Sequence, residues 1–403
     1  MSSPLTGYKV LDMSRILAGP WAGQTLADLG ADVIKVERPG EGDDTRKWGP
    51  PYLSDNEGNA TSESAYYLCA NRGKRSLTLD ITSGEGQAII KKLVAESDVL
   101  LENYKVGGLK KYGLDYESLS AINPRLVYCS ITGFGQHGPY QNRAGYDFMI
   151  QGMGGLMSIT GEPEGGPLKV GVAVTDIFTG LYATIAIQGA LLERERSGLG
   201  QHIDMALLDS QVAVLANQAS NYLVGGMVPG RLGNAHPNIV PYQAFATSDG
   251  FIILAVGNDN QFKNFCELAG RPELADLPQY ATNQARVHNR ETLCAEVAAL
   301  LAQHSEAYWL DELTARGIPC GPINSIDKVM ADPQVNARDM RTTVKHPYND
   351  QLQLVGSPMK FSRTPVNTEQ APPLLGEHSA QILAELGYSE AEIAQFKAKG
   401  LVS

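Results

Sequence analysis

Short apolar segments alternate with helix-forming segments through the first 130 residues, and this alternation limits the fold more than any other feature. Strands are predicted at residues 9–13, 31–36, 76–81, 99–103 and 126–130. A helix is expected between the first two strands, from Ala18 to the stop signal at Gly30. Helical connections of this size imply right-handed crossovers. The sequence therefore predicts an α/β fold with a mostly parallel sheet and a ligand site at the carboxyl ends of its strands.

The rest of the chain is predicted to form longer helices and a second unit. Helices are expected at residues 176–196 and 204–223, and a Gly/Pro-rich linker follows at residues 224–241. A strand pair at residues 243–247 and 251–256, joined by a Ser-Asp-Gly turn, then opens a second unit that extends to about residue 323. Thr82 and Glu85 have the spacing of a capping box for the helix after the third strand.

Composition excludes several classes of partner. The net charge is −11, whereas nucleic acids and anionic membranes are bound by dominantly basic surfaces, so neither is expected as a partner. The five cysteines form no CxxC pair and the N-terminus shows no targeting signal, which predicts a cytoplasmic protein with reduced thiols. An apolar run at residues 170–192 is long enough to span a membrane, but Asp176 within it would be costly in lipid, which favours a buried helix.

Several common site motifs are absent from the sequence. The first turn reads Leu17-Ala18-Gly19-Pro20 instead of GxGxxG, which disfavours a nicotinamide cofactor. The sequence contains no HExxH or similar histidine spacing, so no metal site is predicted. It also contains no GxSxG motif, so a serine hydrolase is not expected. Arg38 follows the second strand, where a guanidinium suits a phosphate, although a solvated loop charge is the simpler alternative.

Asp176 interrupts an apolar segment where a helix is predicted to begin, and two interpretations of it stay open. As an N-cap, it would satisfy backbone amides of the first turn. As a partly buried nucleophile, it would be kept ionised by the helix N-terminus and would attack an activated carbonyl to form a mixed anhydride. His236, in a loop beside Pro237, is a further candidate for a site role.

Ordered segments along nearly the whole chain carry a family resemblance. They include VLDMSRILAGPWAGQTLADLGADVIKVERPGEGDDTR, LLENY, ITGFGQHGPY, AGYDFMIQ, VAVTDIFTGLYA and PPLLGEHSAQILAELGYS. In these segments the sequence resembles the class III CoA-transferases, the family of formyl-CoA transferase and carnitine CoA-transferase. The segments RLGNAHPNIVPYQAF and RVHNR resemble the dicarboxylate subgroup of the succinate–hydroxymethylglutarate CoA-transferase type.

The resemblance implies a site for coenzyme A, position by position. Asp176 takes the place of the family's catalytic aspartate, and Lys111 stands where formyl-CoA transferase has an arginine, which leaves the phosphate contacts there open. Coenzyme A is expected at Leu17, Ala18, Arg38, Leu79, Thr82, Asn103, Tyr104, Lys111, Gly145, Tyr146 and Asp147. Our candidates for a substrate's second carboxylate are Arg15, Arg231 and His236, and those for the oxyanions are the backbone amides of residues 152–155.

The resemblance also implies the architecture. A Rossmann-like large domain would comprise residues 1–223 and 326–403, a smaller α+β domain would be inserted at residues 224–325, and two chains would interlock as a homodimer. The implied activity moves coenzyme A from an acyl-CoA, succinyl-CoA in this subgroup, to a dicarboxylic acid through an aspartyl–acyl anhydride and an enzyme–CoA thioester. Coenzyme A would be a substrate, with no tightly bound cofactor and no metal.

Two alternatives remain. The α-methylacyl-CoA racemases of the same superfamily carry AGHD, where histidine moves the proton. Here Tyr146 stands in that place, and tyrosine, with a pKa near ~10, is a poor base at neutral pH. A non-catalytic CoA-binding protein would have lost the nucleophile, whereas Asp176 is present. The transferase is therefore the expected activity.

Overall fold

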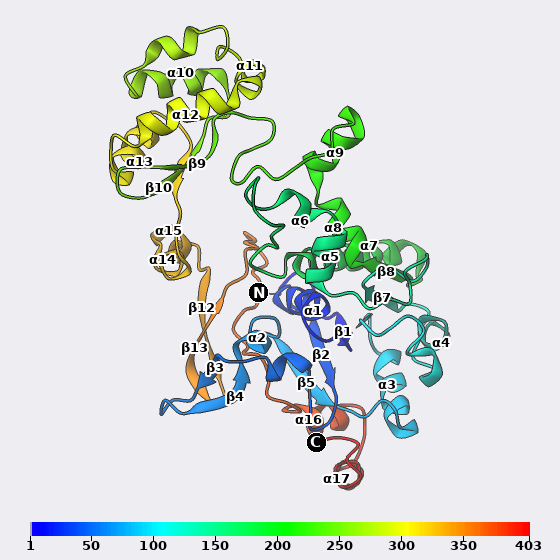
Figure 1. The fold of residues 1–403 in the computed structure, drawn as a ribbon. Helices are drawn as coiled ribbons and strands as arrows, with labels where there is room; N and C mark the ends of the chain where they lie inside the picture. Colours follow the sequence, from blue (N-terminus) through cyan, green and yellow to red (C-terminus); the bar gives the residue numbers. More distant parts are fainter. Residues whose placement is uncertain (1) are drawn as a thin grey trace. The chain divides into compact units, whose positions relative to one another are not determined.

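The computed structural model describes residues 2–403, which form two compact units. Unit 1 comprises the chain up to Leu156, Val170–Ser220 and Pro333–Ser403, and unit 2 comprises Met157–Lys169 and Asn221–Asp332. Figure 1 shows the path of the chain through both units. The 157–169 segment belongs to unit 2, although it lies within the stretch that the sequence assigned to the large domain.

A parallel sheet of six strands forms the centre of unit 1. Its order is β5-β2-β1-β6-β7-β8, and every neighbouring pair is parallel. Numbered along the chain, this is the doubly wound order 3-2-1-4-5-6, which reverses between β1 and β6. The predicted α/β fold with a parallel sheet is confirmed. The strands are β1 (Lys9–Asp12), β2 (Asp32–Glu37), β5 (Lys74–Thr78), β6 (Val99–Glu102), β7 (Val127–Thr132) and β8 (His202–Ala206).

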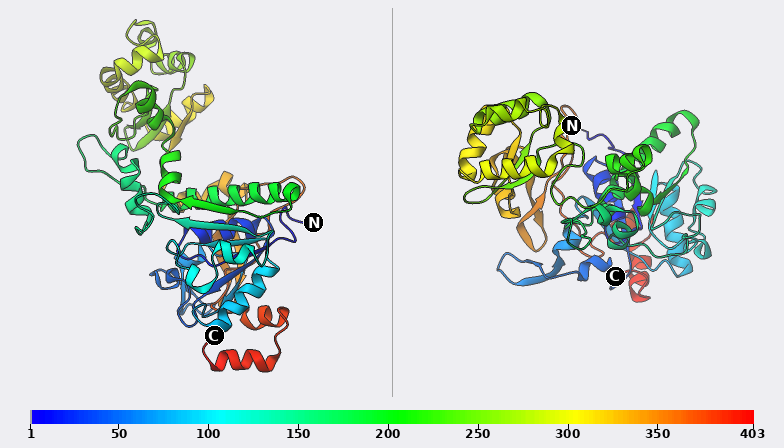
Figure 2. Two further views of the ribbon diagram at one scale, coloured as in Figure 1. Left: turned by 90° about the vertical axis from the view of Figure 1, so that its right-hand side faces the viewer. Right: turned by 45° about the horizontal axis from the view of Figure 1, so that its top comes forward.

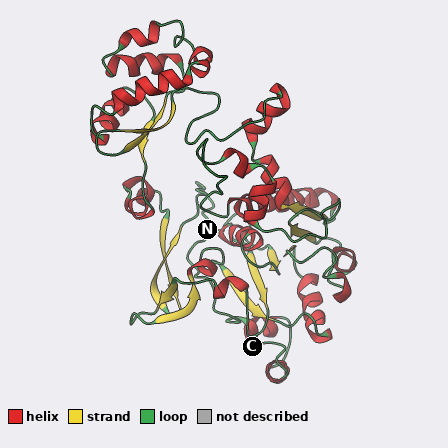
Figure 3. Ribbon diagram, in the orientation of Figure 1, coloured by secondary structure: helices red, strands yellow, loops and turns green. Residues whose placement is uncertain are grey.

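Helices cover both faces of this sheet because its strands are apolar on both sides (Figure 3). Adjacent residues show the alternation: Val10 packs into one core and Leu11 into the other. The Val10 side holds α1 (Ala18–Asp28), α5 (Asp147–Met153) and α7 (Val174–Ser197). The Leu11 side holds α3 (Gly84–Ala95), α4 (Tyr116–Ser120), α16 (Ser379–Glu385) and α17 (Glu390–Ala398), so the C-terminal segment completes the core of unit 1.

The α7 helix has the length and apolar composition of a membrane span, and half of its most apolar window is buried in the protein. It packs against α1 and β7 (Figure 2). The remaining elements of unit 1 and of its boundaries are short: β3 (Tyr52–Ser54), β4 (Ala60–Ser64), β12 (Arg341–His346), β13 (Asn349–Val355), α2 (Ala65–Leu68), α6 (Leu156–Ile159), α8 (Leu207–Ala213), α9 (Ala216–Gly225), α15 (Pro333–Ala337), η1 (Asp44–Lys47) and η2 (Lys110–Tyr112).

Unit 2 has its own core around an antiparallel sheet of order β11-β10-β9. Phe262, Phe265 and Trp309 are buried there. Buried Arg286, from the RVHNR segment, donates to the carbonyls of Val240 and Tyr280 and therefore has a structural role. The elements are β9 (Tyr242–Ala246), β10 (Phe251–Ala255), β11 (Cys320–Pro322), α10 (Asp259–Leu268), η3 (Pro272–Asp276), α11 (Asn283–His288), α12 (Arg290–Leu301), α13 (Glu306–Ala315) and α14 (Ile326–Ala331).

Two local predictions were wrong. The helix predicted at residues 204–223 begins only at Leu207, because residues 202–206 form the edge strand β8, whose alternating burial was not recognised. The capping box of α3 does not start at Thr82: the Ser83 side chain accepts from the Gly86 amide, while the Thr82 hydroxyl donates to Asp80.

Candidate active site

A cavity of about 900 Å³ opens in unit 1 at the carboxyl ends of the parallel strands. Its walls are the segments that follow β1, β2, β5, β6 and β7, completed by residues 141–146 and by Asp176 and Leu207. The cavity therefore includes the point between β1 and β6 where the strand order reverses, which is where open α/β sheets bind ligands. Its position agrees with the site predicted from the strand pattern.

The structure brings together most of the predicted site residues. Those that line the cavity are Arg15, Leu17, Ala18, Arg38, Leu79, Thr82, Asn103, Tyr104, Lys111, Gly145, Tyr146 and Asp176. Asp147 is not among the lining residues. Arg231 and His236 belong to unit 2, where Arg231 donates to the Gly165 carbonyl and Arg290 donates to the His236 carbonyl. Roles for these residues stay predictions.

Asp176 is the third residue of α7, which starts at Val174 after the N-cap Ala173. The N-cap interpretation is therefore wrong. Its carboxylate lines the cavity at 9% exposure, and no hydrogen-bond partner for it exists among residues 2–403. A buried carboxylate without partners is an unusual and costly arrangement, which marks it as a candidate reactive group.

A second carboxylate, Asp147, takes the place at the start of α7 that Asp176 was expected to fill. Its Oδ1 atom accepts from the Thr175 amide at 2.8 Å and from the Asp176 amide at 3.3 Å. Its Oδ2 atom accepts from Gln151 at 2.7 Å. Burial, together with the neighbouring Asp147 charge, raises the pKa of Asp176 to about 7. The expectation that the helix N-terminus keeps Asp176 ionised is therefore not met, because Asp147 already occupies the amides of that first turn.

Tyr66 was missed by the sequence analysis and lies in the electrostatic field of both carboxylates. Burial, followed by the charges of Asp176 and Asp147, raises the pKa of its phenol to about 12. The phenol therefore keeps its proton at neutral pH and is available as a donor. Tyr66 lies on the four-residue helix α2, in a segment for which no site was predicted.

The cavity holds cations of two kinds. Arg15 pairs with Asp44 and Arg38 pairs with Glu41, both near the protein surface. Lys105, Lys111 and Arg143 line the cavity without a salt bridge to any residue in the 2–403 range. The Arg143 guanidinium lies 4.7 Å from the ring centroid of Tyr140, a cation–π contact that orients it. Such unpaired cations suit an anionic ligand, and Lys105 and Arg143 were not predicted.

Two contacts between residues of the cavity fix parts of its wall. The Asn103 amide bridges the backbone of Arg15: its Oδ1 accepts from the Arg15 amide and its Nδ2 donates to the Arg15 carbonyl. Gly133 and Gly145 touch so closely that a Cβ on Gly133 would lie 2.5 Å from the Gly145 Cα atom. Both glycines line the cavity, so this contact shapes the wall beside Tyr146.

The oxyanion site predicted at residues 152–155 finds no support in the cavity of unit 1 and stays a prediction. None of these residues is among those lining the cavity, and the Gly154 amide donates to the Ile150 carbonyl at the end of α5. Glycine permits a close approach to ligand only where the chain reaches the cavity, and at this position the glycines serve to end a helix.

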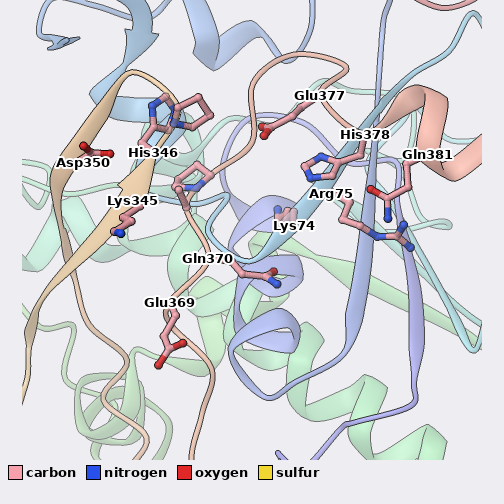
Figure 4. A pocket seen from close by; sticks show the side chains of 13 residues that line it. Lys74, Arg75, Lys345, His346, Asp350, Glu369, Gln370, Glu377, His378 and Gln381 are labelled. Atoms are coloured by element: carbon pink, nitrogen blue, oxygen red, sulfur yellow. The ribbon is translucent and has the colours of Figure 1, made fainter. Parts of the chain in front are cut away.

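A second cavity, of about 660 Å³, is bounded by β5, the β12–β13 hairpin and the segment before α16 (Figure 4). Arg75, which points into it with His378 and Gln381, is already paired with Asp32 and Glu385. His346 is buried here, and its Nε2 atom has no hydrogen-bond partner within the described chain. None of the predicted site residues lines this cavity. Among residues 2–403, no group of three or more His, Cys, Asp or Glu side chains is arranged to hold a metal ion.

A doubly wound sheet, a large cavity at its switch point, unpaired cations and one unpartnered buried carboxylate together characterise an α/β protein with a site suited to an anionic ligand. The chain belongs to CoA-transferase family III, whose model matches residues 5–379. The family resemblance found in the sequence is thereby confirmed.

Similar proteins cover nearly the whole chain. A succinate–glutarate CoA-transferase from Agrobacterium fabrum is 54% identical over 95% of this chain and 96% of its own length. A human succinyl-CoA:glutarate CoA-transferase is 45% identical over 99% of this chain and 90% of its own. The crystal structure of a CAIB/BAIF family protein from Brucella suis superposes with a TM-score of 0.85 at 55% identity, covering 96% of this chain and 100% of that one.

Proposed function

We propose that this enzyme transfers coenzyme A from succinyl-CoA to a dicarboxylic acid, with glutarate as the first acceptor to test. The relatives named for succinate, succinyl-CoA and glutarate match nearly the full chain, which supports the donor and the acceptor class. The observation that carries the proposal is the unpartnered Asp176 carboxylate on the wall of a cavity that also holds unpaired cations.

The proposed chemistry starts when an Asp176 oxygen attacks the thioester carbonyl. The carbon–sulfur bond breaks, CoA leaves as a thiolate, and an aspartyl–succinyl anhydride remains. The thiolate then attacks the aspartyl carbonyl, which releases succinate and leaves an aspartyl–CoA thioester. The acceptor carboxylate attacks that thioester to form a second anhydride, and the returning thiolate attacks its acceptor carbonyl. This step releases the new acyl-CoA and regenerates the Asp176 carboxylate, so the cycle exchanges thioesters without ATP.

A pKa of about 7 suits a carboxylate that must act as a nucleophile. A carboxylate with a strongly lowered pKa would be stabilised as an anion and would attack slowly, whereas burial withholds that stabilisation. The cost is that a substantial fraction of Asp176 is protonated at neutral pH. Only the ionised form of Asp176 can attack a bound substrate. The rate should therefore depend on pH.

Binding of the donor is assigned to the cations of the cavity. Coenzyme A carries phosphates, and we assign them to Arg38, Lys111 and the newly found Lys105, because guanidinium and ammonium groups pair with phosphate oxygens. The start of α1, at Leu17 and Ala18, offers backbone amides without a side-chain cap, a second kind of anion contact. No tightly bound cofactor is needed in this scheme.

The second carboxylate of the acceptor needs a cation of its own. Arg15, Arg231 and His236 are the candidates from the sequence, and Arg143 joins them because it lines the cavity unpaired and oriented by aromatic rings. A glutarate analogue that lacks the distal carboxylate would leave this cation unpaired, so monocarboxylic acids should be poor acceptors.

We also propose that the chain is a cytoplasmic homodimer of interlocked copies. Its support is an apolar stripe on the outer side of α7: Leu181 and Tyr182 are each 39% exposed, Ile185 is 64% exposed and Leu192 is 71% exposed. Side chains of this size on one helix face suit a protein interface. Light scattering after size-exclusion chromatography tests the proposal, and a monomer at micromolar concentration would overturn it.

An acceptor panel tests the proposed function. Purified enzyme is given succinyl-CoA with glutarate, hydroxymethylglutarate, itaconate, malate, butyrate or valerate, and acyl-CoA products are followed by chromatography with mass spectrometry. Formation of glutaryl-CoA, and much poorer use of butyrate and valerate, is the expected result. Equal use of monocarboxylic acids would refute the dicarboxylate assignment. Racemisation of an α-methylacyl-CoA without transfer would support the racemase alternative, in which Tyr146 takes the histidine's place.

A further inference from the structure

The turn between β1 and α1 contributes residues 14–18 to the cavity wall, and its backbone is strained. Ile16 has φ 72°, in the left-handed region. A β-branched side chain is rarely found there, and the conformation costs about 1–3 kcal/mol. Such a turn persists only where its surroundings hold it, so the contacts that hold it contribute to the shape of the binding site.

Lys35 holds this turn from inside the protein. Its Nζ atom donates to the Ser14 carbonyl at 2.9 Å and to the Asp43 carboxylate at 2.9 Å. The other Asp43 oxygen accepts from the Ile16 amide at 3.2 Å. The Lys35–Asp43 pair therefore makes hydrogen bonds to the backbone on both sides of Arg15. The Lys35 and Asp43 side chains are only 1% and 0% exposed.

A second buried pair fixes the neighbouring backbone. Asp12 accepts from the Ser14 amide at 2.9 Å, and Lys74 donates to Asp12 at 2.8 Å and to the carbonyl of Pro20 in the first turn of α1 at 2.9 Å. Both side chains of this pair are 0% exposed. The turn is thus fixed at its β1 end and at its α1 end, and Lys35 supports the middle, where the strained residue lies.

Net stability does not explain the Lys35–Asp43 pair, because removing two charges from water offsets most of their attraction. Direct binding does not explain it either: Lys35 and Asp43 are among the residues around the cavity, but their side chains are enclosed and both hydrogen bonds of the Lys35 ammonium go to the protein itself. What the pair does specify is the position of the Ser14 carbonyl and the Ile16 amide, and hence of Leu17 and Ala18 on the cavity wall.

We propose that Lys35 is a positioning residue for the coenzyme A thioester: it holds the strained β1–α1 turn in the conformation that receives the CoA part of the substrate. This role rests on the proposed function, because it concerns the same cavity. Without Lys35, the backbone at Ile16 relaxes toward a common conformation, and the wall at Leu17 and Ala18 moves with it. Acyl-CoA binding is then weakened, and acceptor binding follows only if Arg15, which lies in the same turn, holds the acceptor's second carboxylate.

The test uses the double variant Lys35→Met/Asp43→Asn. Methionine fills the space of the lysine, and asparagine can still accept from Ile16 while leaving no unpaired charge. The matched control is Arg72→Met/Asp28→Asn, which removes a buried ion pair of 2.7 Å that does not line the cavity. Circular dichroism and thermal unfolding establish that each variant is folded, and calorimetric titration with free CoA measures binding directly.

The expected result for Lys35→Met/Asp43→Asn is a rise of about tenfold or more in the Kd for CoA and in the KM for succinyl-CoA, the size of one lost hydrogen bond to a charged group. In the control variant both values should change by less than about threefold, as expected for sites without shared partners. An unchanged CoA affinity in Lys35→Met/Asp43→Asn, or an equal rise in the control, would overturn the proposal. If the wild-type enzyme fails to form glutaryl-CoA, the proposed acceptor fails, while the titration with CoA still decides the role of Lys35.

Discussion

Unit 1 buries carboxylates in two contrasting ways, beneath the β1–α1 turn and at the start of α7. Beneath the β1–α1 turn, Asp12 and Asp43 are each matched by a lysine and by backbone amides. At the start of α7, Asp176 has no salt bridge and no side-chain hydrogen bond among the described residues, and the charge that raises its pKa besides burial is another carboxylate, Asp147. The compensated carboxylates fix the backbone of the site, whereas the uncompensated one is the group to which we assign the reaction.

The pKa values express this difference. Burial alone would raise the pKa of Asp12, but Lys74 and Lys35 hold it below its usual range. Burial, with Asp147 beside it, raises the pKa of Asp176 to about 7. Glu102 shows that burial by itself is insufficient for a reactive role: its pKa is also raised to about 7, yet it accepts from the Tyr104 amide and is not among the cavity-lining residues.

The largest effect is expected from removing the uncompensated carboxylate. Asp176→Ala should lower the transfer rate by at least about a thousandfold, since a covalent nucleophile has no substitute in the cavity. Binding of free CoA, measured by titration, should be preserved, because the cations to which we assign CoA are untouched. Turnover near the wild-type rate in this variant would remove Asp176 from the mechanism.

Removing a compensated carboxylate should lower the stability of the folded protein. Asp12→Asn leaves the Lys74 ammonium buried without its partner, which should lower the free energy of unfolding by about 3 kcal/mol. Burial lowers the pKa of Lys74 to about 8, so urea unfolding at pH 6, where the ammonium is protonated, measures the change. A loss of stability no larger than that of a surface substitution would show that the pair is not compensated in the way that the geometry suggests.

Asp176→Asn should change the free energy of unfolding in the opposite direction and raise it. The folded-state pKa of Asp176 lies above the ordinary value of 3.8, so the folded protein binds more protons than the unfolded chain between these values. Its contribution to stability is therefore present at low pH and is lost as the pH rises to about 7. Asparagine avoids this loss, and the variant should be more stable than the wild type at pH 8 by about 1 kcal/mol or more, but not at pH 4. Equal stability at both pH values would contradict the raised pKa.

The smallest effect concerns the interaction between the two carboxylates. The wild-type rate should rise with pH through about 7 as Asp176 ionises. Asp147→Asn removes the like charge and can still accept from the Thr175 amide, so it should shift this rise to lower pH and change the maximal rate by less than about tenfold. Rate profiles of both proteins from pH 5 to pH 9 measure the shift. A rise that stays at the wild-type pH would show that burial alone sets the pKa.

The sequence predicted those parts of the site that depend on strand position and missed those that depend on side chains meeting in space. Arg38 and Asn103 were placed at the site by family resemblance, and the cavity does lie where the strand pattern predicts. The Lys74–Asp12 pair joins residues 62 positions apart, and Asp147 reaches amides 28 and 29 positions away, so neither contact has a local sequence signal. β8 was missed because a half-exposed edge strand lacks the apolar run of the inner strands.

The most direct test of the central claim is to identify the covalent adduct on Asp176. The wild-type enzyme is incubated with succinyl-CoA, quenched with hydroxylamine, digested and analysed by tandem mass spectrometry, with Asp176→Asn as the control. Hydroxylamine attacks the aspartyl carbonyl of the CoA thioester, releases CoA and leaves a hydroxamate, so this modification should appear at Asp176 only when succinyl-CoA is present. Efficient transfer by the wild-type enzyme with no modification at Asp176, or with a hydroxamate on a different side chain, would contradict the account.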